Sequence, residues 1–369
     1  MDQSDLAKPQ DTRPFRWGII GTGSVARKFT AGLRQSAGGI AAVAVGRDAG
    51  RTAAFASDFS IANNTVDLAA AVGRPDIDAF YIATPPTAHH AAALTCIAAG
   101  KPILIEKPMS ASAADTKAIV DAARSADVFV MEGIWTRFLP LLTEVHRRVQ
   151  NGDIGEVRSF EASFGLPNIP DARDNQFNAT LGGGALLHRG LYPLALALSF
   201  LGPGVLAGSV ATLGDTGVDE DVTVLLRHGS GAISTLRASL RAPLANDMTI
   251  EGTQGRIHIA APLYRPWQAR LIQTKPSLRT GGGGRPRFEA LRESTFVQGA
   301  AQRLSGWRKQ GSTITRHFTG NGYHYEADAV MAAVRSGATE CAEMPLDDSL
   351  AIATLMDAAR AVWTTGKTS

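Results

Sequence analysis

Three polar side chains interrupt an apolar run near the middle of the sequence, and their types could support proton transfer. In "LGGGALLHRGLYPLA" (181–195), three glycines precede a run that predicts a helix over Ala185–Leu201. His188 and Tyr192 are four residues apart, so we expect them on one helix face, with Arg189 beside His188. A tyrosine in an apolar helix is usually a core residue whose hydroxyl is satisfied. An imidazole and a phenol on one face could instead bind a substrate hydroxyl and exchange its proton.

A glycine-rich turn near the N-terminus has the spacing of a dinucleotide-binding motif. In "WGIIGTGSVARKF", Gly21, Gly23 and Ala26 stand between a predicted strand and a predicted helix. Gly21 permits the tight turn, Gly23 lets the backbone approach a pyrophosphate, and Ala26 allows close packing of helix on strand. The helix N-terminus offers N–H groups to the phosphates. We therefore expect the cofactor to contact Gly21, Thr22, Gly23, Ser24, Val25 and Ala26.

The end of the second predicted strand indicates which nicotinamide cofactor is bound. NAD-specific sites usually place a carboxylate there to bond the ribose 2′-hydroxyl, whereas an arginine accommodates the 2′-phosphate of NADP. Here the strand ends at Gly46, and Arg47 and Asp48 follow at once. Arg47, with Arg51 one helical turn further on, favours NADP. In the alternative interpretation Asp48 bonds the ribose hydroxyls, and the cofactor is NAD.

Two kinds of predicted secondary structure must position these groups. Between residues 15 and 130, short apolar runs alternate with helical ones, which is typical of βαβ units on a parallel sheet. Beyond about residue 150, runs with a period of two and glycine turns predict antiparallel strands. We expect an α/β Rossmann domain over 15–135, then an α+β domain with an open, mostly antiparallel sheet over 136–369. The last predicted helix, Asp348–Trp363, could pack back on the first domain.

Length and composition restrict the class of protein. A chain of 369 residues suits two domains, and 44% hydrophobic with 19% charged residues is typical of a soluble globular protein. The polar stretch 1–14 lacks the apolar region of a signal peptide, so we expect a disordered tail. Cys96 and Cys341 form no disulfide framework, which favours a reducing compartment. No uncharged apolar run reaches the ~18 residues of a membrane span, so we expect a cytoplasmic protein without a membrane partner.

One segment of the chain is strongly basic. Residues 264–317 hold eleven Lys and Arg against two Glu, although the net charge of the whole chain is only +3. A nucleic-acid surface would carry such charge, but no nucleic-acid motif accompanies it and "TGGGGRPR" is typical of a linker. We interpret the segment as a solvated insertion and expect no nucleic-acid partner. We expect no metal site either, because the eight histidines show no HxH or HExxH spacing.

Several motifs together resemble one enzyme family. They are "GTGSVA", "IATPPTAHH", "EKPMS", "MEGIWTRFLP", "GDIGEVRSF", "GGGALLHRGLYP" and "GYHYEAD". In this order they resemble the glucose–fructose oxidoreductase/inositol dehydrogenase (Gfo/Idh/MocA) family, over nearly the whole chain except the basic segment. The run "MEGIWTRFLPLLTEVHRRVQNGDIGEVR" is most similar to the dihydrodiol and D-xylose dehydrogenase branch. The resemblance implies a Rossmann domain followed by an open sheet that often forms the dimer interface, and so a homodimer or homotetramer.

The resemblance also implies roles for individual residues. Lys107 matches the family's catalytic lysine, and Tyr192 matches the position of the acid/base residue. Tyr323 is expected to face the substrate. The positions that line or border the cofactor in the family are matched here by Ala83, Thr84, Pro85, His89, Glu106, Lys107, Trp135 and Arg137.

The proton chemistry can be argued from the side chains themselves. A tyrosine with its usual pKa near ~10 is a poor base at neutral pH, and a neighbouring cation such as Lys107 would favour the phenolate. The family commonly has Asp at the position of His188 and an apolar residue at that of Arg189. Imidazole can donate or accept one hydrogen bond, so we expect His188 to bind a substrate carbonyl or carboxylate, assisted by Arg189 if it faces inward. Because histidine titrates near ~6.5, we expect a limb of the pH profile near neutrality.

These observations predict an NADP-dependent oxidoreductase. It would transfer a hydride between nicotinamide and a carbinol or carbonyl of a sugar, polyol or related cyclic hydroxy compound. Lys107, Tyr192 and His188 would be its catalytic residues, and the three glycines would let the chain pass close to the nicotinamide. In the alternative hypothesis the protein is a non-catalytic or regulatory member of the family that binds the cofactor.

Overall fold

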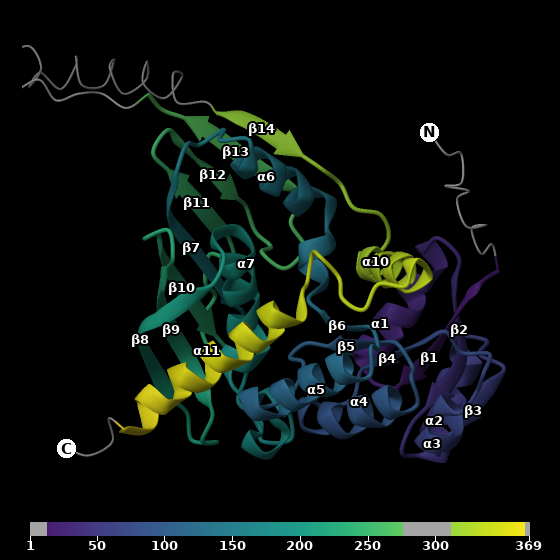
Figure 1. The fold of residues 1–369 in the computed structure, drawn as a ribbon. Coiled ribbons are helices and arrows are strands. Elements are labelled where there is room, and N and C mark those ends of the chain that lie inside the picture. Colours follow the sequence, from purple (N-terminus) through teal and green to yellow (C-terminus); the bar gives the residue numbers. More distant parts are fainter. Residues whose placement is uncertain (1–12, 276–310, 366–369) are drawn as a thin grey trace, which may run out of the picture.

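The structure is a computed structural model that describes residues 13–275 and 311–365 (Figure 1). Almost all of the predicted N-terminal tail and most of the basic segment, 276–310, lie outside the described residues. The described chain forms a parallel α/β half and then a half built on a mostly antiparallel sheet. The predicted fold class is confirmed.

The first half is a doubly wound parallel sheet. Its six strands lie in the order β3-β2-β1-β4-β5-β6, and all neighbours are parallel. Every residue of β4 and β5 is buried, as in strands that are covered on both faces. The strands are β1 Phe15–Ile20, β2 Gly39–Val45, β3 Asn63–Thr65, β4 Ala79–Ile82, β5 Ile103–Glu106 and β6 Val130–Gly133. The helices are α1 Ser24–Gly32, α2 Ala49–Asp58, α3 Leu68–Val72, α4 His89–Ala98 and α5 Ala113–Ser125.

The second half holds an eight-stranded sheet in the order β14-β13-β12-β11-β7-β10-β9-β8. Its strands are β7 Val157–Gly165, β8 Gly204–Leu213, β9 Asp219–His228, β10 Ile233–Ser239, β11 Met248–Gly252, β12 Gly255–Ile259, β13 Gln268–Gln273 and β14 Ser312–Thr315. β7 and β10 are parallel neighbours, and the other described pairs are antiparallel. β13 and β14 belong to the segment interpreted as an insertion, so its two ends are part of the sheet.

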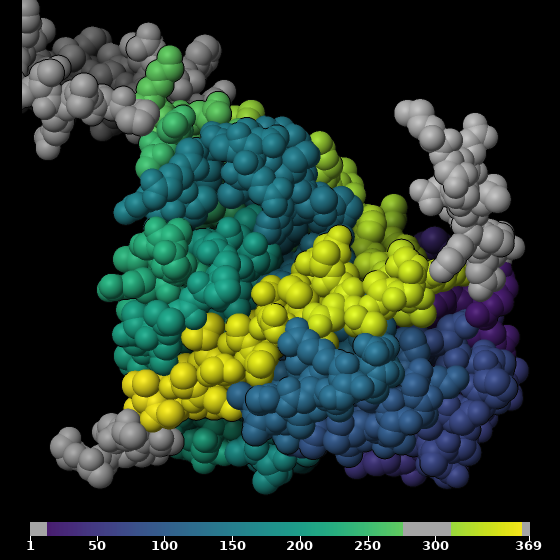
Figure 2. Space-filling view, in the orientation of Figure 1, coloured from purple at the N-terminus to yellow at the C-terminus, as the bar shows by residue number. Residues whose placement is uncertain are grey.

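Helices cover one face of this sheet and connect it to the first half. They are α6 Pro140–Gln150, α7 Leu191–Leu201 and α11 Leu346–Thr365, while α10 Tyr323–Ser336 packs beside α1. Figure 2 shows α11 as a yellow band across the junction of the two halves. The Ala113 N–H at the start of α5 donates to Asp357 of α11 at 2.7 Å. The last helix therefore contacts the first domain.

The helix that carries Tyr192 begins differently from the prediction. Leu186–Gly190 form a π-helical turn, and α7 follows directly. A π turn holds more residues per turn than an α-helix, which rotates the residues before it relative to those after it. His188 lies inside the π turn, and Tyr192 lies in the α-helix that follows it. The stretch Ala179–Leu201 has the length and composition of a membrane-crossing helix, but 78% of its apolar window is buried inside the protein, which is typical of a core helix.

Candidate active site

The predicted phosphate-binding turn lies between β1 and α1, and its small residues allow the close approaches that the motif requires. Gly21 has a φ of +112°, and a Cβ there would lie 2.5 Å from the Ala83 carbonyl oxygen. A Cβ on Gly23 would meet no atom within 4 Å, so the space above it is open to a ligand. Ala26 is fully buried against the core. Ser24, which is exposed, begins α1, and Val25 packs against the core; neither they nor Ala26 line the cavity described next.

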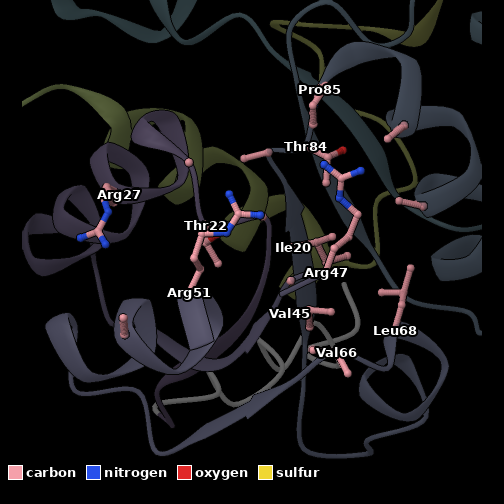
Figure 3. A pocket seen from close by; sticks show the side chains of 17 residues that line it. Ile20, Thr22, Arg27, Val45, Arg47, Arg51, Val66, Leu68, Thr84 and Pro85 are labelled. Carbon is pink, nitrogen blue, oxygen red and sulfur yellow. The ribbon is translucent and has the colours of Figure 1, made fainter. Parts of the chain in front are cut away.

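A cavity of about 500 Å³ opens beside this turn (Figure 3). It lies at the carboxyl ends of β1, β2 and β4, where the strand order reverses and where such folds bind ligands. Predicted residues that line it are Gly21, Thr22, Gly23, Gly46, Arg47, Arg51, Ala83, Thr84 and Pro85. Residues that the sequence motifs did not single out also line it: Ile20, Arg27, Val45, Ala54, Val66, Leu68, Ala88 and Ala92. Its shape and open turn fit a dinucleotide.

The charged residues after β2 differ in how they face this cavity. Arg47 and Arg51 line it and are exposed. Asp48 is not among the lining residues, because its side chain caps α2 by accepting the Arg51 N–H at 2.8 Å. A Cβ on Gly46 would lie 2.3 Å from Thr52 Oγ1, so the glycine lets the chain turn closely over α2.

His89 fixes the rim of the cavity without lining it. Its ring nitrogens contact the carbonyl oxygens of Thr84 at 2.7 Å and Pro108 at 2.9 Å. These carbonyls belong to the loops after β4 and β5, so the buried imidazole holds the two loops together. Burial lowers the pKa of His89. His89 therefore positions these two loops beside the predicted cofactor site.

Lys107 and the π-helical segment meet at the carboxyl end of β5. The Lys107 Nζ donates to the His188 carbonyl oxygen at 3.2 Å and lies 4.9 Å from the centre of the Tyr192 ring. Burial lowers the pKa of Lys107, while the nearby Glu106 and Glu132 carboxyls raise it. The structure thus brings together Lys107 from the first domain and His188 and Tyr192 from the second.

Tyr192 lies in an aromatic environment and is 8% exposed. Its hydroxyl accepts a hydrogen bond from Trp135 Nε1 at 3.3 Å, and Trp135 stacks on Tyr323 with ring centres 4.9 Å apart. Burial raises the pKa of the Tyr192 phenol well above its usual value, and the Glu106 carboxyl raises it further. Lys107 Nζ lies over the Tyr192 ring and the pKa of the phenol is raised, so the structure does not show the phenolate that this cation was expected to favour. The phenol is neutral and can donate a proton.

His188 is also neutral, for two physical reasons. Burial, followed by the positive charge of Lys107, lowers the pKa of His188 to about 4. The expected limb near neutral pH therefore cannot come from this residue. The ring makes a backbone hydrogen bond with Gly182, and its buried Nε2 has no partner among the described residues. A neutral imidazole that donates through one nitrogen presents a lone pair on the other.

Two arginines that were predicted to lie at the site bind other groups of the protein instead. Arg189 is 5% exposed as a residue, and its guanidinium donates to the carbonyl oxygens of Leu166 and Ser239 and to Gln176 Oε1. It holds the loop after β7 and does not assist His188. Arg137 pairs with Asp348 at 2.6 Å and donates to the carbonyl oxygens of Glu343 and Ala195, so it joins α7 to α11 and does not line the cofactor cavity.

Two family models match the chain. The model for an oxidoreductase family with an NAD-binding Rossmann fold matches residues 15–134, and the GFO/IDH/MocA C-terminal domain model matches residues 142–258. The chain belongs to the Gfo/Idh/MocA family. It is an NAD(P)-binding oxidoreductase that acts on CH–OH groups.

Known members of the family agree with the branch that the motifs indicated. Trans-1,2-dihydrobenzene-1,2-diol dehydrogenase of Mus musculus is 32% identical over 358 residues, covering 94% of this chain and 96% of the relative. The same enzyme of Homo sapiens is 30% identical over 354 residues, with 94% and 96% covered. The solved structure of KijD10, a 3-ketoreductase from Actinomadura kijaniata with NADP and TDP-benzene, is 25% identical, has a TM-score of 0.77 and covers 95% of this chain and 98% of that one. A levoglucosan dehydrogenase with NADH and levoglucosan, 20% identical with a TM-score of 0.78, covers 96% and 98% and shares the fold.

Buried acids surround this Gfo/Idh/MocA site: Glu106, which was expected to border the cofactor, and Glu132 and Glu326, to which the motifs assigned no role. Glu106 accepts the Tyr81 hydroxyl and, at 3.2 Å, the Lys107 N–H. Glu326, within the "GYHYEAD" motif, is fully buried, and neither carboxyl oxygen has a hydrogen-bond partner among the described residues. Burial raises the pKa of Glu132 to about 7. In the described part of the chain, no group of three or more His, Cys, Asp or Glu is placed to hold a metal.

The three glycines before His188 make room for other protein groups. A Cβ on Gly183 would lie 2.8 Å from the Gln176 carbonyl oxygen, and one on Gly184 would lie 2.1 Å from Asp219 Oδ1. The glycines therefore allow a carboxylate and a loop to approach the helix start. This differs from the expected approach to the nicotinamide. The role of Asp219 could not be inferred from the sequence, because it lies 31 residues beyond His188.

Proposed function

We propose that this enzyme is an NADP-dependent oxidoreductase of a cyclic compound that carries adjacent hydroxyl groups, such as a dihydrodiol or a sugar. The observation that carries the proposal is the meeting of Lys107, Tyr192 and His188 where the cofactor domain faces the second domain. NADP, when bound, supplies or accepts the hydride. The side chains of this protein would then bind the substrate oxygens and exchange the proton.

The cavity supports NADP as the cofactor. Arg47 and Arg51 line it, and Arg47 forms no ion pair among the described residues, whereas the Asp48 carboxylate caps α2 and lies 3.9 Å from the Arg51 Nε. A phosphate is bound well by charge-assisted hydrogen bonds from arginine. The Asp48 alternative would require this carboxylate to leave its cap or to turn its second oxygen toward the ribose.

Tyr192 would act as the acid in carbonyl reduction. Because its phenol is neutral, it can give its proton to the substrate oxygen as the hydride arrives, and it must accept that proton in the oxidation direction. Lys107, held by the His188 carbonyl, would place a positive charge beside the oxygen. The lone pair on His188 Nε2 would accept a hydrogen bond from an adjacent substrate hydroxyl. This revises the expected partner from a carbonyl or carboxylate to a hydroxyl group.

The substrate class rests on this hydroxyl and on the relatives. The enzymes more than 30% identical to the chain act, by name, on a dihydrobenzene diol. A diol presents one oxygen for oxidation and a second O–H beside it. That arrangement matches one residue that exchanges a proton and one that accepts a hydrogen bond.

The direct test is turnover of a panel of trans-dihydrodiols, aldoses and keto-sugars with NADP(H) and with NAD(H). We expect activity on at least one vicinal diol with NADP, and a loss of about 10²-fold or more in kcat for Tyr192→Phe. Affinity for NADPH, measured by fluorescence titration, should be unchanged in the variant. Tight NADPH binding without turnover of any member of the panel would instead support the non-catalytic alternative.

A further inference from the structure

The helix segment that carries His188 and Tyr192 is anchored by a residue from another strand. Asp219, the first residue of β9, accepts the Leu186 N–H on its Oδ2 at 2.6 Å, and the residue is 5% exposed. Leu186 is the first residue of the π-helical turn. The first N–H groups of a helical segment have no partners inside it, so this carboxylate supplies one from outside.

The chain before the helix is shaped around this carboxylate. Gly184 has a φ of +124°, and a Cβ there would lie 2.1 Å from Asp219 Oδ1. No side chain could be placed at this position without moving the carboxylate. The glycine and the aspartate therefore act together: because Gly184 has no side chain, the Asp219 carboxylate can reach the start of the helix.

We propose that Asp219 is a positioning residue of the reaction, whose carboxylate fixes the first turn of the segment that carries His188 and Tyr192. The inference rests on the proposed function, because it assigns the segment to catalysis. His188 lies two residues after Leu186, and its carbonyl oxygen receives the Lys107 Nζ at 3.2 Å. Movement of the Leu186 end would displace this carbonyl and with it both Lys107 and the imidazole.

The anchor is sensitive to pH. Burial raises the pKa of Asp219 to about 6, although the Leu186 and Ala185 N–H groups and the charge of Arg360 on α11 oppose the shift. The neighbouring Glu220 carboxyl is held apart by Arg241 at 2.7 Å. Below about pH 6 the carboxylate gains a proton and becomes a weaker acceptor, so the helix start is released.

Because the pKa of Asp219 is raised, a positioning role and a merely structural role predict different results when the residue is replaced. Ionised Asp219 is less favourable in the folded than in the unfolded protein, so an amide in its place need not destabilise the fold. If Asp219 only stabilised the fold, its replacement would lower the melting temperature. If it positions the site, its replacement lowers kcat with little change in the melting temperature.

The experiment compares the wild-type enzyme with Asp219→Asn and with Asp215→Asn, an exposed control in the preceding loop. Between pH 5 and 8, wild-type kcat should fall on the acid side with a midpoint near 6. Asp219→Asn should have a kcat about tenfold or more lower at pH 7.5, no such acid limb, an unchanged KM for NADPH and a similar melting temperature. Asp215→Asn should behave as the wild type.

A second measurement needs neither turnover nor a variant. Hydrogen exchange of the Leu186 amide in the wild-type protein, corrected for its intrinsic pH dependence, should lose protection by about tenfold as the pH falls through 6. Unchanged protection, or an acid limb that persists in Asp219→Asn and so belongs to another group such as Glu132, would overturn the proposal. Absence of turnover in the wild type would reject the proposed function, while the exchange experiment would still test the anchor.

Discussion

At the scale of single residues, arginines that carry the same charge have different roles because their surroundings differ. Arg137 and Arg189 are buried, and their guanidinium groups donate to carbonyl or carboxyl oxygens of the protein. Arg47 is exposed on the cofactor cavity and forms no ion pair among the described residues. A phosphate is attracted most by a cation that no other group neutralises. Arg47 is therefore the residue on which a preference for NADP should depend.

Replacing Arg47 by Ala should weaken NADPH binding about ten- to a hundredfold, equivalent to about 1.5–3 kcal/mol, because a charge-assisted hydrogen bond is lost. NADH affinity should hardly change, and fluorescence titration with both cofactors measures the difference. Asp48→Ala serves as the matched control. It should keep the preference for NADPH and lower stability by about 1 kcal/mol through loss of the helix cap. A marked loss of NADH affinity in that control would favour the NAD alternative.

At the scale of elements, α10 brings a buried acid to the ends of β5 and β6. Glu326 in its first turn lies against Gly133, where a Cβ would be 3.4 Å from the Glu326 carboxyl and 3.6 Å from the Glu106 Cα. Burial and the Glu106 carboxyl raise the pKa of Glu326 well above its usual value. The folded protein therefore holds this proton over a range of pH in which the unfolded chain releases it.

Glu326→Gln should consequently alter how stability depends on pH. The wild type loses stability as the pH rises above the unfolded pKa of ~4.3, because unfolding then releases the proton of Glu326. The amide carries no such proton, so the free energy of unfolding of the variant should fall less between pH 4.5 and 8. At neutral pH it should be about 1–3 kcal/mol higher than that of the wild type. Thermal melts at stepped pH values measure this, with the exposed Glu161→Gln on β7 as control. Parallel stability curves for Glu326→Gln and wild type would contradict it.

The elements also show how far the sequence predicts the fold and the site. Strand–helix alternation predicts the first sheet, and the period of two predicts β7 and β9 to β12, because both patterns follow from burial along one element. Motifs locate Gly21, Arg47, Lys107 and Tyr192 for the same local reason. The π-helical turn and the contacts of Asp219 and Arg189 depend on residues distant in the chain. Contacts of this kind leave no pattern in the local sequence, so they could not be predicted from it.

At the scale of the whole molecule, one face of the eight-stranded sheet is covered by no helix among residues 13–275 and 311–365. On β9, Val222, Val224 and Leu226 are buried toward α7 and α11, whereas Leu225 between them is exposed. Arg227 on this outer face is flanked across the strands by Val205, 66% exposed, and Ile233, 52% exposed. These exposed apolar side chains gather around Arg227 on one face of the sheet, and such a patch marks a surface for protein contact. Its position opposite Tyr192 means that a partner could bind there without covering the site.

We expect this face to join two copies of the chain, as the resemblance to the family implied. Light scattering after size exclusion should then give twice the mass of the chain, or four times the mass if dimers pair. Leu225→Asp places a charge on this face opposite Thr235 and Gly208, with no cation directly across the strands, and should yield monomers, because a charge without a partner in an interface is expensive to desolvate. Ile40→Asp, which adds the same charge to an exposed isoleucine on β2, should leave the assembly intact. Since His188 and Tyr192 lie on the helical side of the sheet, the monomer should keep its affinity for NADPH. Wild-type protein that is monomeric at micromolar concentration would contradict the expectation that this face joins two copies.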